Sequence, residues 1–222
     1  MTESSPIASA EELPRTLPIF PLSGVLLLPR GRLPLNIFEP RYLAMIGDAM
    51  ASAPLVGIVQ PMDSEQEGDP PEVYKIGCVG HITSFKESDD GRYLITLTGV
   101  CRFDVGKELP IMLSGYRRVR AHYNRYIGDF IRAKDETVDC SRLKTILRAY
   151  FQLHGIDVNW NAMENATGEG LVTSLAMICP FAPSEKQAIL ETRHFAERIE
   201  VITALMEMAV LARVRGDDSG IH

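Results

Sequence analysis

The chain has 222 residues, of which 45% are hydrophobic and 23% are charged, as in an ordinary globular protein. Its formal net charge of −6 gives no general attraction to nucleic acid or to an acidic membrane surface. The densest apolar run, Val25 to Leu28, is far too short to span a membrane, and the first sixteen residues lack the pattern of a secretory signal. We therefore expect a cytoplasmic protein without a membrane partner, built as one large domain or two small ones.

Prolines divide the stretch from Leu17 to Tyr42 into short pieces. Because proline fixes φ and lacks an N–H donor, the first four of them exclude a long helix and favour edge strands and turns. Pro40 instead suits the first position of a helix, and apolar residues follow it at helical spacing, which predicts a helix from about Pro40 to Ala51. The segment is therefore expected to form strand, turn, strand and helix, with Ile37 and Phe38 in the core.

Beyond this helix, up to about Tyr123, short runs are either continuously apolar or alternate with period two, which is typical of strands. Asp90-Gly91 predicts a tight hairpin turn, because glycine tolerates the positive φ that such turns need. Gly99 is expected to bend the chain between two strands. Many short strands with a single helix indicate a small, partly closed β-barrel, interrupted by a mobile surface loop at residues 63–72. The expected strands are Leu55–Val59, Cys78–Phe85, Tyr93–Thr98, Val100–Val105 and one within Gly115–Tyr123.

From Val138 onward the hydrophobic period changes to 3.6, which predicts helices. The first helix is expected to be capped by Asp139 and ended by Gly155. The third is expected to begin with a capping box, in which Ser184 and Gln187 satisfy exposed backbone donors. Four helices with short connections indicate a compact bundle beside the barrel. Their apolar faces lie in Leu143–Phe151, in Leu171–Cys179, after Ser184, and in Thr192–Arg213.

Two segments make the chain resemble a known family. The run LPIFPL from Leu17 and the later run LPLNIFEPRY, which ends at Tyr42, are similar to the opening of the amino-terminal, substrate-binding domain of the ATP-dependent Lon proteases. The similarity continues through IGCVGHITSFKESDDGRYLITLTGVCRFDV, Ile76 to Val105, and through the helical half, so it spans about Leu13 to Arg215. The resemblance implies an α+β fold, in which a β-barrel lobe of the PUA-like superfamily precedes a helical lobe.

These patterns also predict where the parts of the chain begin and end. Because the resemblance to the substrate-binding part occupies nearly the whole chain, we expect a stand-alone homologue of that domain, without the ATPase and Ser-Lys protease modules of Lon. No Gly-x-x-x-x-Gly-Lys-Ser/Thr run, which would cradle phosphates, occurs in the sequence. The expected parts are a disordered tail at 1–12, the β-rich lobe at 13–125, the helical lobe at 126–215 and a disordered tail at 216–222.

No group of residues predicts catalysis. Ser141 and Lys144 form a Ser-x-x-Lys pattern, but the supporting motifs of the enzymes that use it are absent, and a helix start explains the pattern better. The five histidines are scattered without metal-ligand spacing, and the four cysteines contain no Cys-x-x-Cys pair. We therefore expect no catalytic residue, no metal and no cofactor.

A basic strip is the one motif that competes with a protein-binding role. Arg117, Arg118, Arg120 and Arg125 are interleaved with aromatic residues, and guanidinium groups beside aromatic rings can grip phosphates and stack on bases. PUA-like barrels also include RNA-binding members. A strand whose arginines alternate across a sheet and pair with carboxylates is the simpler interpretation, because the net charge of −6 disfavours nucleic acid.

The leading hypothesis is a non-enzymatic, protein-binding module that binds unfolded segments or a partner such as a protease or an adaptor. An RNA-binding module that uses the basic strip is the alternative, and an undetected hydrolase is a weaker third. The sequence does not identify the protein-binding residues or the partner. It also leaves open whether the chain forms a homo-oligomer and whether Lon itself is involved.

Overall fold

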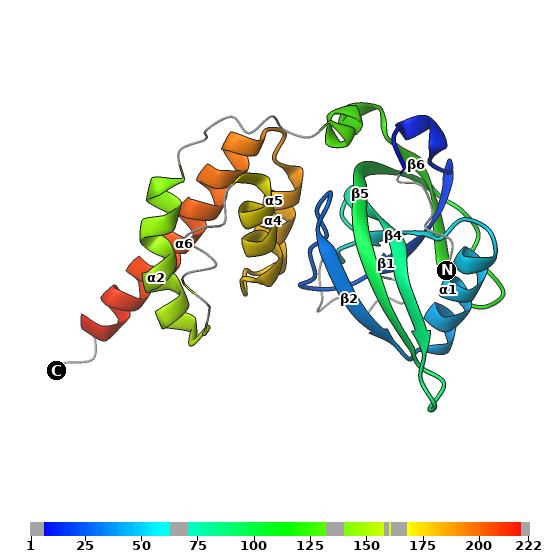
Figure 1. Ribbon diagram of the computed structural model, residues 1–222, viewed down its shortest axis with the longest axis horizontal. Coiled ribbons are helices and arrows are strands. Elements are labelled where there is room, and N and C mark those ends of the chain that lie inside the picture. The colour runs from blue at the N-terminus through cyan, green and yellow to red at the C-terminus, as the bar shows by residue number, and fades with distance from the viewer. Residues whose placement is uncertain (1–6, 63–70, 132–139, 158–159, 161–167, 219–222) are drawn as a thin grey trace. The chain divides into compact units, whose positions relative to one another are not determined.

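The chain divides into two compact units after Arg132 (Figure 1). Residues 1–132 contain all of the strands that the computed structural model describes, and the described elements of residues 133–222 are helices. Backbone and side chains are described for residues 7–62, 71–131, 140–157, 160 and 168–213, and the backbone alone for 214–218.

The first unit is built on a six-stranded sheet. The strand order is β2-β5-β4-β3-β1-β6, and neighbours are antiparallel except β1 and β3. The predicted succession of strand, turn, strand and helix at the start of the unit is confirmed. The elements are β1 Thr16–Pro21, β2 Arg32–Ile37, α1 Pro40–Ala51, β3 Leu55–Val59, β4 Ile76–Glu87, β5 Tyr93–Glu108 and β6 Arg117–His122, with the 3-10 helices η1 Ala10–Glu12 and η2 Asn124–Phe130.

The sheet closes on itself because β5 is long enough to pair with two different strands, one after the other, along the same edge. Its first half lies between β2 and β4, with Leu97 opposite both Leu33 and Ile82. Its last residues pair with β6 instead of β2, and Asp104 lies opposite His122. Because β6 also pairs with β1, the strands β5, β4, β3, β1 and β6 form a ring, and β2 flanks it. The partly closed barrel predicted from the sequence is confirmed in this form.

Gly99 does not separate two strands, contrary to the prediction. The residues on both sides of it belong to the single strand β5. A Cβ atom at Gly99 would lie 2.0 Å from the carbonyl oxygen of Leu28, and the Gly99 backbone is hydrogen-bonded to Arg30 and Gly31 in the loop before β2. Val100 is an extra residue opposite β4, so the register shifts here. The close approach of the loop therefore requires the glycine, which accompanies a bulge rather than a break.

The interior of the barrel is apolar. The helix α1 packs on β1 and β3, and the rings of Phe20 and Tyr42 lie 4.1 Å apart between their centroids. Burial of each large apolar side chain stabilises the unit by roughly 1.5–3 kcal/mol. Apolar strand residues without any solvent exposure are Leu17, Ile19, Val56, Cys78, Val79, Leu97, Cys101, Phe103 and Val119.

The second unit is a bundle of helices. Gly155, with φ of 62°, ends the first helix as predicted, whereas the expected cap Asp139 lies outside the described residues. Tyr150 and Phe151 are buried, and their rings contact Phe181 and Trp160 at centroid distances of 5.7 and 5.9 Å. None of the described helices is long and apolar enough to cross a membrane. The helices are α2 Ser141–His154, α4 Gly168–Ile178, α5 Pro183–Glu191 and α6 Phe195–Asp218.

The predicted capping box at Ser184 is wrong. The helix α5 begins at Pro183, because proline suits the first helical position. The carboxylate of Glu185 therefore reaches back and accepts a hydrogen bond from the Ala182 backbone N–H at 2.7 Å. Gln187 donates to Glu191 at 2.8 Å instead of capping the helix.

The boundaries of α6 also differ from the prediction. Thr192 ends α5, and its hydroxyl donates to the carbonyl oxygen of Ile189 at 2.7 Å, so α6 begins only at Phe195. At its other end the helix continues to Asp218, into the tail expected at 216–222. Residues 219–222 lie outside the described part of the chain.

Other expected segments are only partly described. The tail expected at 1–12 contains the short helix η1, and residues 1–6 lie outside the described residues, as do 63–70 of the expected mobile loop. The sequence predicts that the helical lobe starts at residue 126, but η2, which spans Asn124–Phe130, contacts β5 and belongs to the first unit. A buried ion pair, described below, fastens η2 to the barrel.

Candidate functional site

In the part of the chain that the structure describes, the Ser-x-x-Lys pair does not meet other groups that could support catalysis. Ser141 and Lys144 lie in the first turn of α2, where the Lys144 backbone N–H makes a helical hydrogen bond to Cys140. Among the described residues, no group of three or more His, Cys, Asp or Glu side chains could hold a metal ion. Burial lowers the pKa of His81 and raises the pKa of the Cys101 thiol to about 12. At neutral pH this thiol is protonated, which makes it a poor nucleophile.

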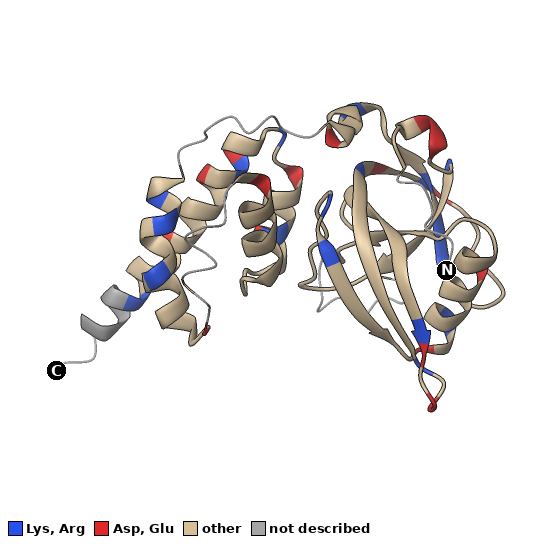
Figure 2. Ribbon diagram, viewed as in Figure 1, with Lys and Arg blue, Asp and Glu red and all other residues tan. Residues whose placement is uncertain are grey.

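The strand β6 separates the arginines of the basic strip onto two faces; basic positions are blue in Figure 2. Arg117 lies on the buried face together with Val119, and it is 8% exposed. Its guanidinium donates to both carboxylate oxygens of Glu108 and, at 2.8 Å, to the carbonyl oxygen of Pro71. Arg117 therefore holds β6 to neighbouring backbone and does not face the solvent.

The other three arginines lie in two places. Arg118 and Arg120 share the outer face of β6, where Arg120 donates to the Thr16 hydroxyl at 3.0 Å. Arg125 lies in η2 and binds the carboxylate of Asp104 at 2.8 Å. The structure thus brings Arg118 and Arg120 together and assigns carboxylate partners to Arg117 and Arg125.

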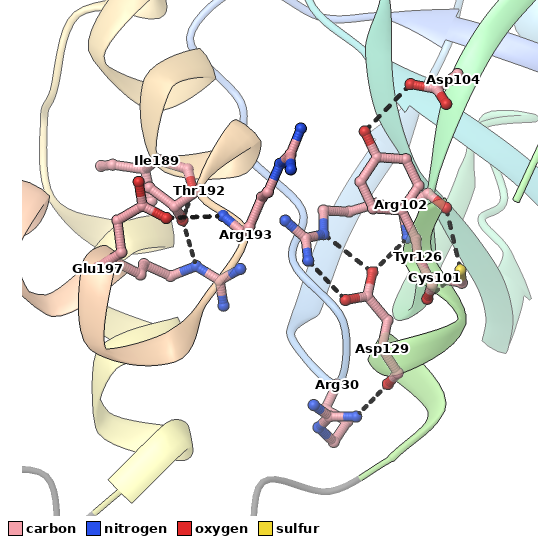
Figure 3. A network of polar contacts seen from close by, with 11 residues as sticks. Arg30, Cys101, Arg102, Asp104, Tyr126, Asp129, Ile189, Thr192, Arg193 and Glu197 are labelled. Atoms are coloured by element: carbon pink, nitrogen blue, oxygen red, sulfur yellow. Dashed lines mark hydrogen bonds and ion pairs between the residues drawn. The ribbon is translucent and has the colours of Figure 1, made fainter. Parts of the chain in front are cut away.

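A buried ion pair joins η2 to β5 (Figure 3). The backbone N–H, Nε and Nη2 of Arg102 donate to the carboxylate of Asp129 at 2.9, 3.0 and 2.8 Å. Burial opposes the charge of Arg102, but the hydrogen bonds with Asp129 raise its pKa overall. Arg30 adds a hydrogen bond to the Asp129 carbonyl oxygen at 2.6 Å. These contacts have a structural role. The Arg102 guanidinium and the Asp129 carboxylate bind each other and thereby hold η2, the last described element of the first unit, to the barrel.

Exposed apolar side chains gather at the end of the sheet near the β4–β5 hairpin. Phe38 directly follows β2, whose last residue pairs with Tyr93. Tyr93 contacts Phe85, with ring centroids 4.9 Å apart, and Leu94 is the next residue of β5. Phe38 is 63% exposed, Phe85 41% and Leu94 44%. We call these four residues the Phe38 surface.

The Phe38 surface includes both faces of the sheet. Successive strand residues point to opposite faces, so Leu94 lies on the other face from Tyr93. Beside Leu94 is a shallow depression of about 450 Å³ that crosses β2, β5 and β4. Its size suits one or two side chains of a bound chain. Two cross-strand rows line it, Pro34–Thr96–Ser84 and Asn36–Leu94–Lys86.

The sequence interpretation missed this surface. Ile37 is buried as expected, but Phe38, which we expected in the core, is exposed. The signal that could have found it is the alternation of β2, in which Asn36 points outward and Ile37 inward. Continuing that alternation by one residue directs Phe38 outward.

A second apolar element is the loop between β5 and β6. Leu113 is fully exposed at its tip. The turn that presents it is closed by a hydrogen bond from the Gly115 N–H to the Met112 carbonyl oxygen at 2.8 Å, and Gly115 has φ of 88°. The Tyr116 hydroxyl donates to the Asp48 carboxylate at 2.8 Å, which ties the loop to α1. Leu113 is therefore held in solvent by ordered structure.

Comparison with known proteins identifies the family of this chain. The family model of the ATP-dependent protease La (LON) substrate-binding domain matches residues 16–208. Lon protease from Anaeromyxobacter dehalogenans and Lon protease 2 from Myxococcus xanthus are each 25% identical to the chain over 207 residues, which is 90% of this chain and 24% of each relative. The chain thus spans about a quarter of the length of these curated relatives.

Two solved structures share the fold. The Lon N-terminal domain protein from Xanthomonas campestris has a TM-score of 0.57 at 22% identity, over 85% of this chain and 97% of that chain. The N-terminal domain of the Mycobacterium avium complex Lon protease has a TM-score of 0.60 at 15% identity, over 86% of this chain and 98% of that chain. The resemblance stated from the sequence is confirmed, and the chain belongs to the family of ATP-dependent protease La (LON) substrate-binding domains.

Proposed function

We propose that this chain is a non-catalytic module that binds extended, apolar segments of other proteins at the Phe38 surface. The family supports a substrate-binding role in general. The exposed ring of Phe38 is the observation that carries the location, because 63% of this large apolar side chain remains in contact with water. Burial of such a ring by a partner is favourable by roughly 25 cal/mol for each Å² covered.

The surroundings of Phe38 favour an extended chain as the ligand. The depression beside Leu94 is shallow and combines apolar side chains with Ser84 and Thr96, which can hydrogen-bond a peptide backbone. Lys86 and Glu87 carry charges next to the apolar residues, so the rim remains hydrated. A surface of this kind can cover one or two side chains at a time without requiring a folded partner.

The affinity is expected to be micromolar. An unfolded segment loses conformational entropy when it is ordered, and this loss offsets much of the gain from apolar contacts. Burial of apolar surface should also give a negative heat-capacity change. Calorimetric titration with a reduced, carboxymethylated model protein, beside its native form, measures both quantities. Equal binding to both forms, or none to either, would remove unfolded segments as the ligand.

Variants locate the binding surface within the chain. The Phe38→Ser and Leu94→Ser double variant should bind the carboxymethylated protein about tenfold more weakly, because the two exposed apolar groups no longer contribute. Ile178→Ser is the matched control, since Ile178 is 70% exposed but lies on α4 in the other unit. Equal losses in both variants would show that the Phe38 surface is not the site.

The proposed module contributes binding free energy and no chemical step. The purified chain is therefore expected neither to hydrolyse ATP nor to cleave casein. Turnover that persists through purification and disappears in Ser141→Ala would contradict this. A protease or an adaptor that receives the bound segment is the partner class that the family relation supports. We place the module in the cytoplasm, a reducing compartment, because its four cysteines are free.

A further inference from the structure

The strand β2 has one edge without a neighbouring strand. It is the first strand in the order of the sheet, it pairs with β5, and it lies outside the closed ring (Figure 1). No other described strand pairs with its second edge, which we call the open edge of β2. Such an edge presents a row of backbone N–H and C=O groups, and an extended chain can bind to them by adding a strand to the sheet.

Hydrogen bonds beside β2 show which of its residues face the open edge. The Gly99 backbone N–H of β5 donates to the Gly31 carbonyl oxygen at 2.8 Å, so the backbone groups of these two residues point toward each other. Along an antiparallel pair this direction alternates with period two. Every second residue counted from Gly31 therefore bonds to β5, and the residues between them point their backbone groups to the open edge. The outward residues are Arg32, Pro34 and Asn36.

The position of Pro34 agrees with this assignment, because a proline has no N–H to donate. Facing β5, it would remove a hydrogen bond of the sheet, whereas facing the open edge it removes none. The open edge therefore offers the N–H groups of Arg32 and Asn36 and the carbonyl oxygens of all three outward residues. None of these backbone groups is hydrogen-bonded to another described segment.

Pro34 also disfavours a second copy of β2 as the occupant of the open edge. Two copies paired antiparallel about their centres would place Pro34 opposite Pro34, and this central pair would have no hydrogen bond. A chain without proline at that position donates its own N–H to the Pro34 carbonyl oxygen. The open edge is therefore better suited to a segment of another protein than to itself.

The apolar face of β2 is incompletely covered along the open edge. Leu33 and Leu35 are partly exposed, although Leu97 and Ile95, directly opposite them on β5, are at most 3% exposed. The difference arises because β5 has strands on both sides and β2 has a strand on one side. A strand added to β2 would cover Leu33 and Leu35 with its own side chains, spaced two residues apart.

Arg32 adds a preference of charge. It is exposed, it is the single charged residue of β2, and no described carboxylate forms an ion pair with it. Opposite charges on neighbouring strands attract each other, and like charges repel. An acidic residue at the end of the segment that lies beside Arg32 is therefore favoured over a basic one.

We propose that the open edge of β2 binds an extended segment of another protein by strand addition, and that this segment is apolar at alternate positions and acidic beside Arg32. The inference rests on the proposed binding of extended segments, and it specifies their backbone geometry and sequence pattern. Phe38 directly follows β2, so the edge continues into the Phe38 surface. Side chains on the other face of the segment lie beside Pro34 and Asn36, at the depression.

Backbone methylation of a synthetic peptide tests strand addition. The probe is a short fluorescein-labelled peptide in which valine and threonine alternate, with a glutamate at one end. One derivative has every valine N-methylated and another has every threonine N-methylated, which removes N–H groups without changing side chains. Because only every second N–H of an added strand points to β2, one derivative should bind at least about tenfold more weakly than the probe, and the other should bind like it.

The same measurement gives the orientation of the added strand. Valines that cover Leu33 and Leu35 point their N–H groups away from β2 in an antiparallel strand and toward β2 in a parallel one. Weak binding of the threonine-methylated peptide therefore indicates antiparallel pairing, and weak binding of the valine-methylated peptide indicates parallel pairing. Equal binding of the two derivatives, whether weakened or not, would overturn the proposal.

Two variants of residue 36 test the edge on the protein. Asn36→Pro and Asn36→Ala both lose the amide side chain, but only the proline variant loses the outward N–H, and neither loses a bond to β5. The probe should bind Asn36→Pro about fivefold more weakly than Asn36→Ala, which corresponds to one hydrogen bond. Thermal unfolding shows that both barrels are intact. Equal affinities of the two variants would contradict strand addition.

Exchange of charges tests the role of Arg32. Replacement of the glutamate of the probe by lysine should weaken binding to the parent chain about threefold and should strengthen binding to Arg32→Glu. The same effect of this replacement on both chains would remove the acidic residue from the proposed pattern.

The carboxymethylated model protein separates this inference from the proposed function. If that protein binds the parent chain and loses affinity in the Phe38→Ser and Leu94→Ser double variant, while the two peptide derivatives bind equally, the Phe38 surface remains the site and strand addition is wrong. If neither the carboxymethylated protein nor the probe binds the parent chain, both proposals are wrong.

Discussion

The two units differ in one ion pair of the barrel that is buried, whereas the ion pairs described in the helical unit are on the surface. In the barrel unit the side chains of Arg102 and Asp129 are 5% and 9% exposed. In the helical unit Arg142 is 59% exposed and binds Glu207 at 2.6 Å and Glu200 at 3.2 Å on the surface. A buried charge that loses its partner cannot return to water, whereas an exposed one can. The barrel therefore depends on this buried ion pair in addition to its apolar core, whereas the bundle depends on its apolar core and gains little from its exposed pairs.

The difference reflects how each unit is assembled. The barrel must hold η2 against a strand that lies 27 residues earlier in the chain, and the pair Arg102–Asp129 does so with three hydrogen bonds. The bundle packs α2 against α6, and Leu147 of α2 and Ile202 of α6 are both at most 1% exposed. Surface arginines add to this contact but do not create it.

The largest expected effect comes from Asp129→Ala, which leaves the buried guanidinium of Arg102 without its carboxylate. We expect the barrel unit to lose about 3–5 kcal/mol of stability. Native-state hydrogen exchange of the β5 amides measures this loss. The double variant Arg102→Leu with Asp129→Leu removes both charges and should lose less than Asp129→Ala. If Asp129→Ala lost no more stability than the removal of an exposed ion pair, the contrast between the buried pair and the exposed pairs would be wrong.

The next effect tests the close approach of backbone in the barrel. Gly99→Ala should destabilise the unit by about 1–3 kcal/mol, because the added Cβ would overlap the carbonyl oxygen of Leu28. Gly47→Ala is the matched control in α1, where nothing lies within 4 Å of the added atom. That change should stabilise the helix by roughly 0.5–1 kcal/mol. Urea unfolding followed by circular dichroism measures the change in stability of both variants. Equal changes would contradict the inference that the Leu28 backbone leaves no room for a Cβ atom at residue 99.

The exposed pair of the bundle should be sensitive to pH and salt. Hydrogen bonds from Arg142 lower the pKa of Glu207 below its ordinary value of 4.5. A carboxyl with a lowered pKa stabilises the folded state above its unfolded pKa, and this stabilisation is lost as the pH falls through the folded pKa. Arg142→Ala should therefore melt slightly earlier than the parent at neutral pH and low salt.

Thermal unfolding followed by the fluorescence of Trp160, the single tryptophan, measures this difference in the bundle. The melting temperatures of Arg142→Ala and the parent should converge in acid and at high salt, because protonation and screening remove the same interaction. A difference of constant size across pH and salt would show that Arg142 acts through packing.

The smallest expected effect concerns the outer arginines of the barrel. Arg117 and Arg125 bind carboxylates, so we expect no salt-sensitive binding of single-stranded RNA to the parent chain. The Arg118→Glu and Arg120→Glu double variant should then behave like the parent in fluorescence anisotropy with labelled RNA. Micromolar binding at low salt that this variant abolishes would favour the RNA-binding alternative.

Elements that depend on one residue's backbone preference were predictable. Pro40 begins α1, Gly155 ends α2 with φ of 62°, and Gly91 forms the β4–β5 turn with φ of 78°. The start of α1, the end of α2 and the β4–β5 turn each depend on the φ that a single residue allows, so the local sequence is enough to predict them. The start of α5 was predicted wrongly. Ser184 suits the cap of a helix, but Pro183 before it suits the first helical position, and the helix begins at the proline.

The candidate sites were less predictable, because exposure depends on segments far apart in the chain. Ile37 and Phe38 are adjacent and both apolar, yet one is 2% and the other 63% exposed. The basic strip reads as one cluster, but β6 turns Arg117 inward toward Glu108 and Arg118 outward. On α6, too, only the packing of the bundle decided that Met206 is buried while Met208 and Leu211 are exposed.

The sequence by itself determined the family, the succession of strands and helices, and the change from a period of two to a period of 3.6. These features follow from local dihedral preferences and from the repeat of apolar residues along one chain segment. Only the tertiary structure decided that β5 closes the ring through β6, that Arg102 finds Asp129, and that Phe38 stays in water. Each of these results depends on distances between remote segments, and the packing of the whole unit sets those distances.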